Sequence, residues 1–460
     1  MKLFGTDGIR GKAGQAPLEP ETVARVGAAL VRALDKPSAF APSASADKKG
    51  LSPQRTAPRI VIGRDTRESG TWIEEELSRG LSSEGAAVVS AGIVPTPAIA
   101  YLARTEGFDA GLVISASHNP YEDNGIKVFS GSGAKLTEQL EAAVETLVAD
   151  PSWRVPADAG AIDRRDLSAH YLEHLELILD DAGPMAGAPI VVDCANGATA
   201  ALAPALLTTL GFDVHPIGIT PNGRNINLDC GSTHLDGLAR EVVASGARLG
   251  IAFDGDGDRA LFVDRHGSVV DGDAVLLMGA IHLQAEGKLP GGAVVATVMS
   301  NIGLEIALRD RGIALVRTGV GDKYVMEEMM KQGLALGGEQ SGHIIFSDHL
   351  FTGDGIATAL NVLRIMIESG KELDELAGAL VTYPQVLVNV RVKQKTDLRT
   401  VPAIADTMRR VEERLAGQGR LLVRYSGTEP LLRIMLEGKD HDTIRSWADD
   451  IAGVVREHLA

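Results

Sequence analysis

Short apolar runs alternate with longer amphipathic segments along most of the chain. The runs are bounded by turn-forming residues, and between them apolar side chains recur at helical spacing, as in Ile73, Leu77 and Leu81. The expected strands are the runs at 59–63, 86–94, 111–116, 189–193, 249–253 and 293–298. Because strands that alternate with helices favour parallel sheets covered by helices, the pattern predicts three successive α/β units.

The last part of the chain has a different pattern. Residues 386–392 alternate between apolar and polar like a half-buried strand, and residues 403–415 have helical periodicity. We expect a smaller α+β unit there, in which two further strands flank residues 424–430. A chain of 460 residues is too long for one hydrophobic core. The predicted domains are 1–168, 169–268, 269–384 and 385–460.

One segment of the first unit lacks the means to pack. Residues 37–58 are rich in Ser, Ala, Pro and Lys and contain almost no large apolar side chain. We therefore expect residues 38–57 to form a mobile insertion outside the fold.

Charge and cysteine content restrict the class of partner. The formal net charge of −16 argues against nucleic acid or an anionic membrane surface as the main partner. No apolar run approaches the length of a membrane span, and the start MKLFGTDGIRG lacks a signal-peptide core. Cys194 and Cys230 make no disulfide framework and show no metal-ligand pairing. These features predict a cytoplasmic protein.

Candidate chemistry begins in the stretch DAGLVISASHNPYEDNGIK at residues 109–127. Ser117 lies where an apolar run ends, with His118 and Asn119 beside it. Pro120 fixes its own φ and disfavours helical geometry at Asn119, so the backbone forms a set turn. Ligands gather outside the carboxyl ends of strands in open α/β sheets. The Ser117 hydroxyl is therefore a candidate nucleophile, and a plain polar turn is the alternative.

Three carboxylates, those of Asp254, Asp256 and Asp258, alternate with glycines directly after an expected strand. They repel one another unless a cation lies between them, and hard oxygen ligands suit Mg²⁺ or Ca²⁺. An EF-hand is excluded, because Arg259 stands where such a loop requires Gly and Arg265 where it requires Glu. The motif predicts a divalent-cation site, with a solvated acidic turn as the alternative.

Two later glycine-flanked loops carry groups suited to a phosphorylated polyol. In GGEQSGH, Glu339 and Ser341 suit sugar hydroxyls, and His343 can move a proton. Candidate phosphate ligands near the C-terminus are Arg424, Ser426, Thr428, Arg433 and the backbone N–H of Gly427. Plain hairpin loops are the alternative for both.

An anionic ligand of so acidic a chain needs a local concentration of basic residues. Arg10, in the glycine-rich FGTDGIRG, has a fork-shaped guanidinium that can donate hydrogen bonds to an anion. Arg64 and Arg67 follow the expected strand at 59–63. We expect these three arginines to supply part of that charge. A glycine-rich terminal turn is the alternative for the first stretch.

Taken together, the loops resemble those of the α-D-phosphohexomutase superfamily, in particular its glucosamine phosphate branch. The matching stretches are FGTDGIRG, GRDTR, ISASHNPYEDNGIK, NINLDCGSTH, DGDGDR, TGVGDKYV, GGEQSGH and RYSGTEPLLR, which cover nearly the whole chain. The resemblance implies a four-domain, heart-shaped enzyme with a central cleft. Three related α/β domains with mixed sheets would precede a C-terminal α+β domain.

The resemblance also implies an isomerase that converts glucosamine 6-phosphate and glucosamine 1-phosphate into one another. Ser117 would be a phosphoserine, and one Mg²⁺ per chain would be held by Asp254, Asp256, Asp258 and the phosphoryl oxygen on Ser117. Glucosamine 1,6-bisphosphate would be intermediate and activator, and the product would feed UDP-N-acetylglucosamine and cell-wall synthesis.

The implied catalytic residues are Ser117, His118, Lys127 and His343. A proton must leave the attacking hydroxyl, and the sequence does not choose between Lys127 and His343 as its acceptor. The implied substrate-binding residues are Arg10, Arg259, Glu339, Ser341, Arg424, Ser426, Gly427, Thr428 and Arg433. The expected partner is a small sugar phosphate, and a homodimer is the expected assembly.

Two alternatives differ in substrate or in chemistry. GEQSGH and TGVGDKYV differ from phosphoglucomutases and phosphomannomutases, where the sugar loop more often reads GEMSGH or GEMSAH. Lys323 stands where the glucosamine phosphate branch usually has Arg. One alternative is a mutase of neutral sugar phosphates. The other is a catalytically silent sugar-phosphate sensor, against which the intact Ser117 and the three aspartates argue.

Overall fold

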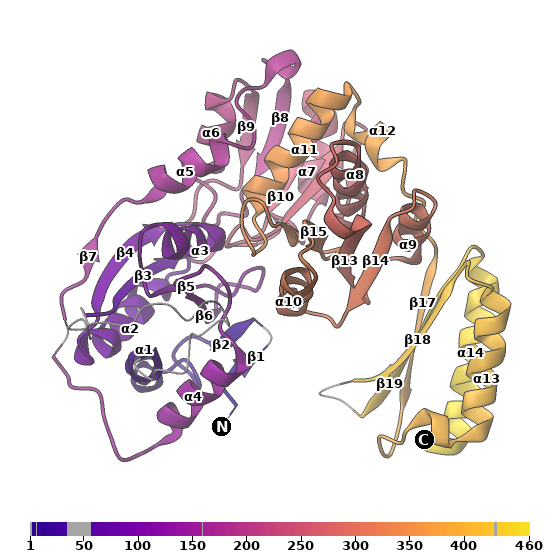
Figure 1. Cartoon of the computed structure of the whole chain (residues 1–460), viewed down its shortest axis with the longest axis horizontal. Helices are drawn as coiled ribbons and strands as arrows, with labels where there is room; N and C mark the ends of the chain where they lie inside the picture. The colour runs from indigo at the N-terminus through magenta and orange to yellow at the C-terminus, as the bar shows by residue number, and fades with distance from the viewer. Residues whose placement is uncertain (1, 6, 35–56, 159, 427–429) are drawn as a thin grey trace, which may run out of the picture. The chain divides into compact units, whose positions relative to one another are not determined.

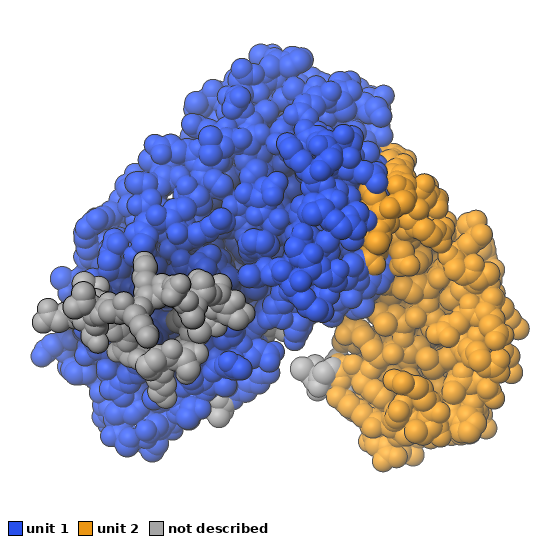
Figure 2. Space-filling model, viewed as in Figure 1, with its two compact units in different colours: residues 1–298, 316–377 blue, residues 299–315, 378–460 orange. Residues whose placement is uncertain are grey.

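The computed structural model describes residues 2–5, 7–34, 57–158, 160–426 and 430–460. The chain forms two compact units, coloured separately in Figure 2. Unit 1 comprises residues 1–298 and 316–377, and unit 2 comprises residues 299–315 and 378–460. Apart from Ala57, the expected insertion at 38–57 lies outside the described residues.

Unit 1 begins with a seven-stranded sheet in the order β1-β2-β6-β5-β3-β4-β7 (Figure 1). Its strands are β1 (Phe4–Gly5), β2 (Gly8–Lys12), β3 (Arg59–Arg64), β4 (Ala87–Ile93), β5 (Ala110–Ile114), β6 (Asp123–Ser130) and β7 (Asp163–Arg164). The associated helices are α1 (Pro20–Leu34), α2 (Gly70–Ser83), α3 (Thr96–Thr105) and α4 (Glu138–Ala149). Strand β3 pairs in parallel with β4 and β5, whereas β6 is antiparallel to β5 and β2.

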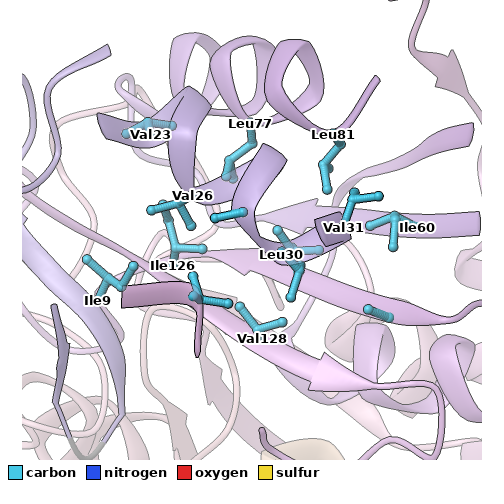
Figure 3. Packing of buried hydrophobic residues seen from close by; sticks show 14 of the residues in the cluster. Ile9, Val23, Val26, Leu30, Val31, Ile60, Leu77, Leu81, Ile126 and Val128 are labelled. Atoms are coloured by element: carbon cyan, nitrogen blue, oxygen red, sulfur yellow. The ribbon is translucent and has the colours of Figure 1, made fainter. Parts of the chain in front are cut away.

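Helices cover both faces of this sheet. Apolar side chains of α1 and α2 meet those of β3 and β6 in one buried core, part of which Figure 3 shows. The buried core residues labelled there are Ile9, Val23, Val26, Leu30, Val31, Ile60, Leu77, Leu81, Ile126 and Val128. On the opposite face, Ile99 of α3 lies so close to Gly63 and Gly111 that a Cβ at either glycine would be 2.7 Å from it. The periodic Ile73, Leu77 and Leu81 are buried on α2, as the sequence predicts.

The second sheet has five strands in the order β12-β11-β10-β8-β9. They are β8 (Pro189–Asp193), β9 (Asp213–Ile217), β10 (Leu249–Phe253), β11 (Ala260–Asp264) and β12 (Val269–Val270), with helices α5 (Ser168–Glu176), α6 (Ala203–Thr209) and α7 (Asp236–Ser245) and the 3₁₀ turn η1 (Gly183–Met185). The central β10 is buried throughout, parallel to β8 and antiparallel to β11. The turn between β10 and β11 contains the three candidate metal ligands.

The third sheet has four strands in the order β14-β13-β15-β16. They are β13 (Ala293–Thr297), β14 (Ala314–Thr318), β15 (Leu336–Gly338) and β16 (Ile344–Phe346). The helices of this region are α8 (Gly272–Ala285), α10 (Asp322–Gln332), α11 (Gly355–Ser369) and α12 (Leu373–Ala377), and η2 (Pro290–Gly292) precedes β13. Helix α9 (Ile302–Arg309), between β13 and β14 in the chain, belongs to unit 2. Strands β13 and β15 are parallel, and β15 and β16 form an antiparallel hairpin around Glu339 to His343.

Unit 2 contains an antiparallel sheet in the order β17-β19-β18, with two long helices. Its elements are β17 (Gln385–Arg391), η3 (Leu398–Thr400), α13 (Pro402–Leu415), β18 (Arg420–Tyr425), β19 (Leu431–Glu437) and α14 (His441–Leu459). Burial alternates residue by residue along β17, because one face of the strand packs in the unit core. This confirms the period-2 pattern read from the sequence.

The mixed α/β sheets and the C-terminal α+β unit agree with the predicted fold class. The simpler expectation of purely parallel sheets is wrong, since β6, β11 and β16 each pair antiparallel with a neighbour. Strand β6 is also an element that the apolar pattern did not indicate. Among the described residues, no helix combines the length and apolar character that crossing a membrane requires.

Candidate active site

Ser117 lies in the loop that follows β5, and its side chain is fully buried. The Ser117 hydroxyl donates a hydrogen bond to Oδ2 of Asp254 and lies 3.2 Å from Nδ1 of His118. The N–H of Ser117 donates to Oγ of Ser115 at 2.9 Å. The structure thus brings the candidate nucleophile against the first carboxylate of the acidic turn, 137 residues later in the chain.

The acidic turn gathers three buried carboxylates. Oxygen atoms of Asp254, Asp256 and Asp258 lie within 4.8 Å of one another. Among the described residues, Oδ1 of Asp256 and Oδ1 of Asp258 are buried without a hydrogen-bond partner. Burial, together with repulsion from Asp258 and Asp256, raises the pKa of Asp254 well above its usual value. Orphaned hard oxygens and mutual repulsion fit a site built for a divalent cation.

Lys127 comes to this turn from β6, where it pairs across the sheet with Val113 of β5. Its Nζ donates to Asp256 at 2.8 Å and to Asp258 at 2.9 Å, and it lies 3.2 Å from Asp7. Burial alone would lower the pKa of Lys127, but the three carboxylates hold that pKa well above its usual value. Lys127 is therefore an ammonium in this arrangement and neutralises charge at the acidic turn.

Two histidines flank the same turn. Burial, with Arg259 and Arg10 nearby, lowers the pKa of His118 to about 4, so its ring is neutral near pH 7. His343 accepts a hydrogen bond at Nε2 from the N–H of Gly353 at 3.0 Å. Its proton therefore lies on Nδ1, which faces Oδ1 of Asp258 at 3.7 Å.

A cavity of about 430 Å³ opens beside these groups. The residues that line it are Leu3, Gly5, Asp7, Gly8, Arg10, His118, Asp258, Arg259, Val320, Gly321, Asp322 and Glu339. Five of them were candidate site residues, drawn from four separate stretches of sequence. Ser341 is half-buried on the same hairpin as Glu339 but is not part of the described cavity lining.

Two acidic residues that line the cavity, Asp7 and Asp322, are not among the predicted site residues. Asp7 forms ion pairs with Arg10 and Lys127. Nζ of Lys135 lies 2.6 Å from Oδ1 of Asp7 and also forms an ion pair with Asp322. Asp7 belongs to the matched stretch FGTDGIRG and Asp322 to TGVGDKYV, so their position in these motifs could have indicated a role in the site. Lys135 lies outside every matched stretch and had no such indication.

The expectation that Arg67 helps to bind the anionic ligand is wrong. Its side chain is buried, and Nε donates to Asp65 at 2.8 Å. The remaining guanidinium donors contact the backbone carbonyls of Ser117, Asn119, Pro120 and Asp123. With all five N–H groups engaged inside the protein, Arg67 has no donor left for a ligand.

In unit 2, Arg424 of β18 and Arg433 of β19 are direct cross-strand partners. Because directly opposite residues of paired strands share one face of a sheet, both arginine side chains lie on the same face, which suits an anionic ligand. The carbonyl of buried Ser426 accepts from Nζ of Lys395 at 2.7 Å, which adds a cation that the sequence reading missed. Gly427 and Thr428 lie outside the described residues.

Four family models match the chain in succession. They are the phosphoglucomutase/phosphomannomutase alpha/beta/alpha domains I, II and III and the C-terminal domain, at residues 1–154, 169–267, 271–383 and 387–454. The chain belongs to the phosphoglucomutase/phosphomannomutase family. As a member of that family, it is an enzyme of the phosphohexomutase superfamily.

Curated relatives in this family resemble the chain over its full length. It is 49% identical to a phosphoglucosamine mutase of Solibacter usitatus, over 99% of both chains. It is 48% identical to a phosphoglucosamine mutase of Geobacter sp., over 100% of this chain and 98% of the relative.

Solved structures share the fold at lower identity. A phosphoglucomutase/phosphomannomutase family protein of Burkholderia thailandensis superimposes with a TM-score of 0.76 at 23% identity, over 98% of this chain and 97% of that one. An Aspergillus fumigatus N-acetylphosphoglucosamine mutase, solved with GlcNAc-6P and magnesium, has a TM-score of 0.67 at 19% identity, over 99% and 95% of the two chains.

Proposed function

We propose that the chain is a phosphoglucosamine mutase that converts glucosamine 6-phosphate and glucosamine 1-phosphate into one another. The observation that carries the proposal is the buried Ser117 hydroxyl bonded to Asp254 of a three-carboxylate turn, beside a cavity large enough for a sugar phosphate. A sugar-phosphate sensor needs neither the hydroxyl nor the turn. The 49% and 48% identity to relatives named phosphoglucosamine mutase, over nearly the full length, supports an amino-sugar phosphate as the substrate.

The proposed reaction starts from a phosphoryl group on Ser117. The bond from phosphorus to Ser117 Oγ breaks as a hydroxyl oxygen of the sugar phosphate bonds to phosphorus, which yields glucosamine 1,6-bisphosphate. The hydroxyl proton passes to a base, and Ser117 Oγ takes up a proton as it leaves phosphorus. Of the two candidate bases, Lys127 is held as an ammonium by three carboxylates, so we propose His343. Transfer of the other phosphoryl group back to Ser117 then releases the isomer.

Phosphoryl transfer depends on positioning and charge neutralisation. We propose that Asp254, Asp256 and Asp258 hold one Mg²⁺, with a phosphoryl oxygen on Ser117 as a further ligand. The bound ion supplies positive charge at the phosphoryl group during transfer. Lys127 keeps Asp256 and Asp258 in place as a fixed cation. Arg10 and Arg259 line the cavity, where they can donate hydrogen bonds to an anionic substrate.

Further parts of the proposal concern the rest of the chain. Glu339 and Ser341 bind sugar hydroxyls, and Arg424, Ser426, Gly427, Thr428 and Arg433 bind the phosphate that is not reacting. We assign the four domains to residues 1–168, 169–268, 269–384 and 385–460. We also propose a cytoplasmic enzyme that acts as a homodimer and supplies UDP-N-acetylglucosamine synthesis.

Two measurements test the function. Intact-mass analysis of the purified chain should show one phosphate, which the Ser117→Ala variant lacks. Coupled assays on glucosamine 6-phosphate, glucose 6-phosphate and mannose 6-phosphate should show the highest kcat/KM with the amino sugar, and Ser117→Ala should be inactive on all three. A higher kcat/KM with a neutral sugar would replace the substrate assignment. Substantial turnover by Ser117→Ala would remove Ser117 from the phosphocarrier role.

A further inference from the structure

The backbone of Ser117 has a conformation that serine rarely adopts. Its φ is +53°, in the left-handed region that favours glycine. Such a conformation persists in a non-glycine residue only where surrounding contacts hold it. The contacts that do so here come from two side chains that approach the loop from different sheets.

Residues 115–122, between β5 and β6, form the serine loop. Arg67 and Asn227 bind the same two carbonyl groups of this loop. The carbonyl of Ser117 accepts from Nη2 of Arg67 and from Nδ2 of Asn227, each at 2.9 Å. The carbonyl of Asn119 accepts from the same two nitrogens, at 2.9 Å and 3.0 Å. Because both side chains are buried, water offers no substitute for a lost donor.

Arg67 is itself fixed by a closed ring of hydrogen bonds. Asp65 accepts from Nε of Arg67 at 2.8 Å and from Oγ of Ser115 at 2.6 Å. Oγ of Ser115 in turn accepts from the N–H of Ser117. One side of the serine loop is therefore held from within its own sheet region.

Asn227 reaches the loop from the segment between β9 and α7 in the second sheet region. Its backbone is also left-handed, with φ of +58°, and its N–H donates to the carbonyl of Ala195 at 2.9 Å. The acidic turn packs against this contact, since a Cβ at Gly255 would lie 2.6 Å from the Ser117 carbonyl and 2.9 Å from Nδ2 of Asn227. Asn227 thus joins the serine loop to the turn that bears Asp254.

We propose that Asn227 is a positioning residue: its amide holds Ser117 in the left-handed conformation and in line with Asp254. The inference rests on the proposed function, because it assumes that Ser117 carries the phosphoryl group. Asn227 is not part of the described cavity lining, so its effect passes through Ser117. Its loss therefore lowers the rate of phosphoryl transfer and leaves sugar-phosphate binding unchanged.

The test compares three variants. Asn227→Gly keeps the left-handed backbone and removes the amide donor. Asn227→Asp keeps the shape but points carboxylate oxygens at two carbonyls. Asp229→Gly is the matched control, because Asp229 lies on the same segment, has φ of +54° and is exposed. Each variant is measured for kcat, KM, thermal midpoint and the rate at which glucosamine 1,6-bisphosphate phosphorylates Ser117.

Asn227→Gly should lower kcat and the phosphorylation rate together by roughly tenfold to a hundredfold, while KM stays within about twofold. Asn227→Asp should lower kcat and the phosphorylation rate further, and Asp229→Gly should match the wild type in both. If Asn227→Gly also lowers the thermal midpoint, the isosteric Asn227→Asp decides through its kcat and KM. Wild-type kcat in both Asn227 variants would overturn the inference alone. A wild-type chain that never carries phosphate on Ser117 would overturn it together with the proposed mutase.

Discussion

Asp256 illustrates how much one carboxylate does in this site. Its Oδ2 accepts from Lys127 at 2.8 Å and from the Thr96 hydroxyl at 2.6 Å, and its backbone carbonyl accepts from the N–H of Thr96. Its Oδ1 is buried and has no hydrogen-bond partner among the described residues. The side chain is thus held rigidly on one oxygen and left available on the other, as a metal ligand requires.

Asp256→Asn should therefore lower turnover by about two powers of ten, because an anionic ligand is lost where the metal is expected. Asp264→Asn is the control. Asp264 is a buried aspartate at the far end of β11, where it accepts from the N–H groups of His266 and Ser268, and asparagine can keep those bonds. The measurement is kcat over a Mg²⁺ titration. Full activity of the wild type after EDTA treatment would contradict the metal assignment.

At the scale of elements, a buried carboxylate joins α5 to the start of α11. Asp354 caps α11 by accepting from the N–H of Ala357, and both of its oxygens lie 2.9 Å from the Tyr171 hydroxyl. Burial raises the pKa of Asp354 to about 6. The folded chain therefore holds the Asp354 proton more tightly than the unfolded chain does.

The sign of the pH effect follows from that shift. The stability that Asp354 contributes is present in full below its unfolded pKa, near 3.8, and is lost as pH rises through about 6. Relative to Asp354→Asn, the wild type should gain stability as pH falls from 7 to 4, by at most about 3 kcal/mol. Thermal midpoints of both proteins across this range give the comparison. Parallel curves would show that the pKa of Asp354 is not raised.

A second element-scale feature is the close crossing of α1 and α2. A Cβ at Gly80 would lie 1.9 Å from the carbonyl oxygen of Ala24, so only glycine allows this approach. Gly80→Ala should push the helices apart and destabilise the chain by about 1–3 kcal/mol. Gly237→Ala, on α7 with open space around the glycine, should be neutral or slightly stabilising. Denaturant midpoints of the two variants check this, and equal effects would contradict it.

At the scale of the whole molecule, the two units are not simple halves of the chain. Residues 299–315 belong to unit 2, although they lie between segments of unit 1. Buried Glu437 of β19 accepts from Nε of Arg420 at 2.9 Å and from the N–H of Ile302 at 3.2 Å. Within unit 2, this carboxylate joins α9 to the C-terminal sheet.

The prediction at this scale concerns the insertion. Deletion of residues 38–57 should shift the thermal midpoint by less than about 3 °C, because the segment has almost no apolar surface to bury and loop closure depends weakly on length. Turnover should match that of the full chain. A loss of several degrees would mean that the segment packs on the body or mediates assembly.

The fold class and the main loops of the candidate site could be predicted from the sequence alone. The apolar run of 189–193 and the helical spacing of apolar residues in α2 are local properties that the sequence displays directly, and both segments bury those side chains. The motifs around Ser117, Asp254 and Glu339 were equally visible, because each loop is a continuous stretch. Their chemistry depends on residue types that the sequence lists directly.

The sequence did not show which loops meet or which partner each charged group contacts; these follow from how the chain packs. Arg67 and Arg10 are indistinguishable as residue types, yet one is buried among carbonyls and the other lines the cavity. Lys127, Lys135 and Asn227 contact partners 110 to 187 residues away in the chain, and no local pattern encodes such contacts. A contact of this kind is set by how sheets pack, and its energy depends on burial that exists only after the chain has folded.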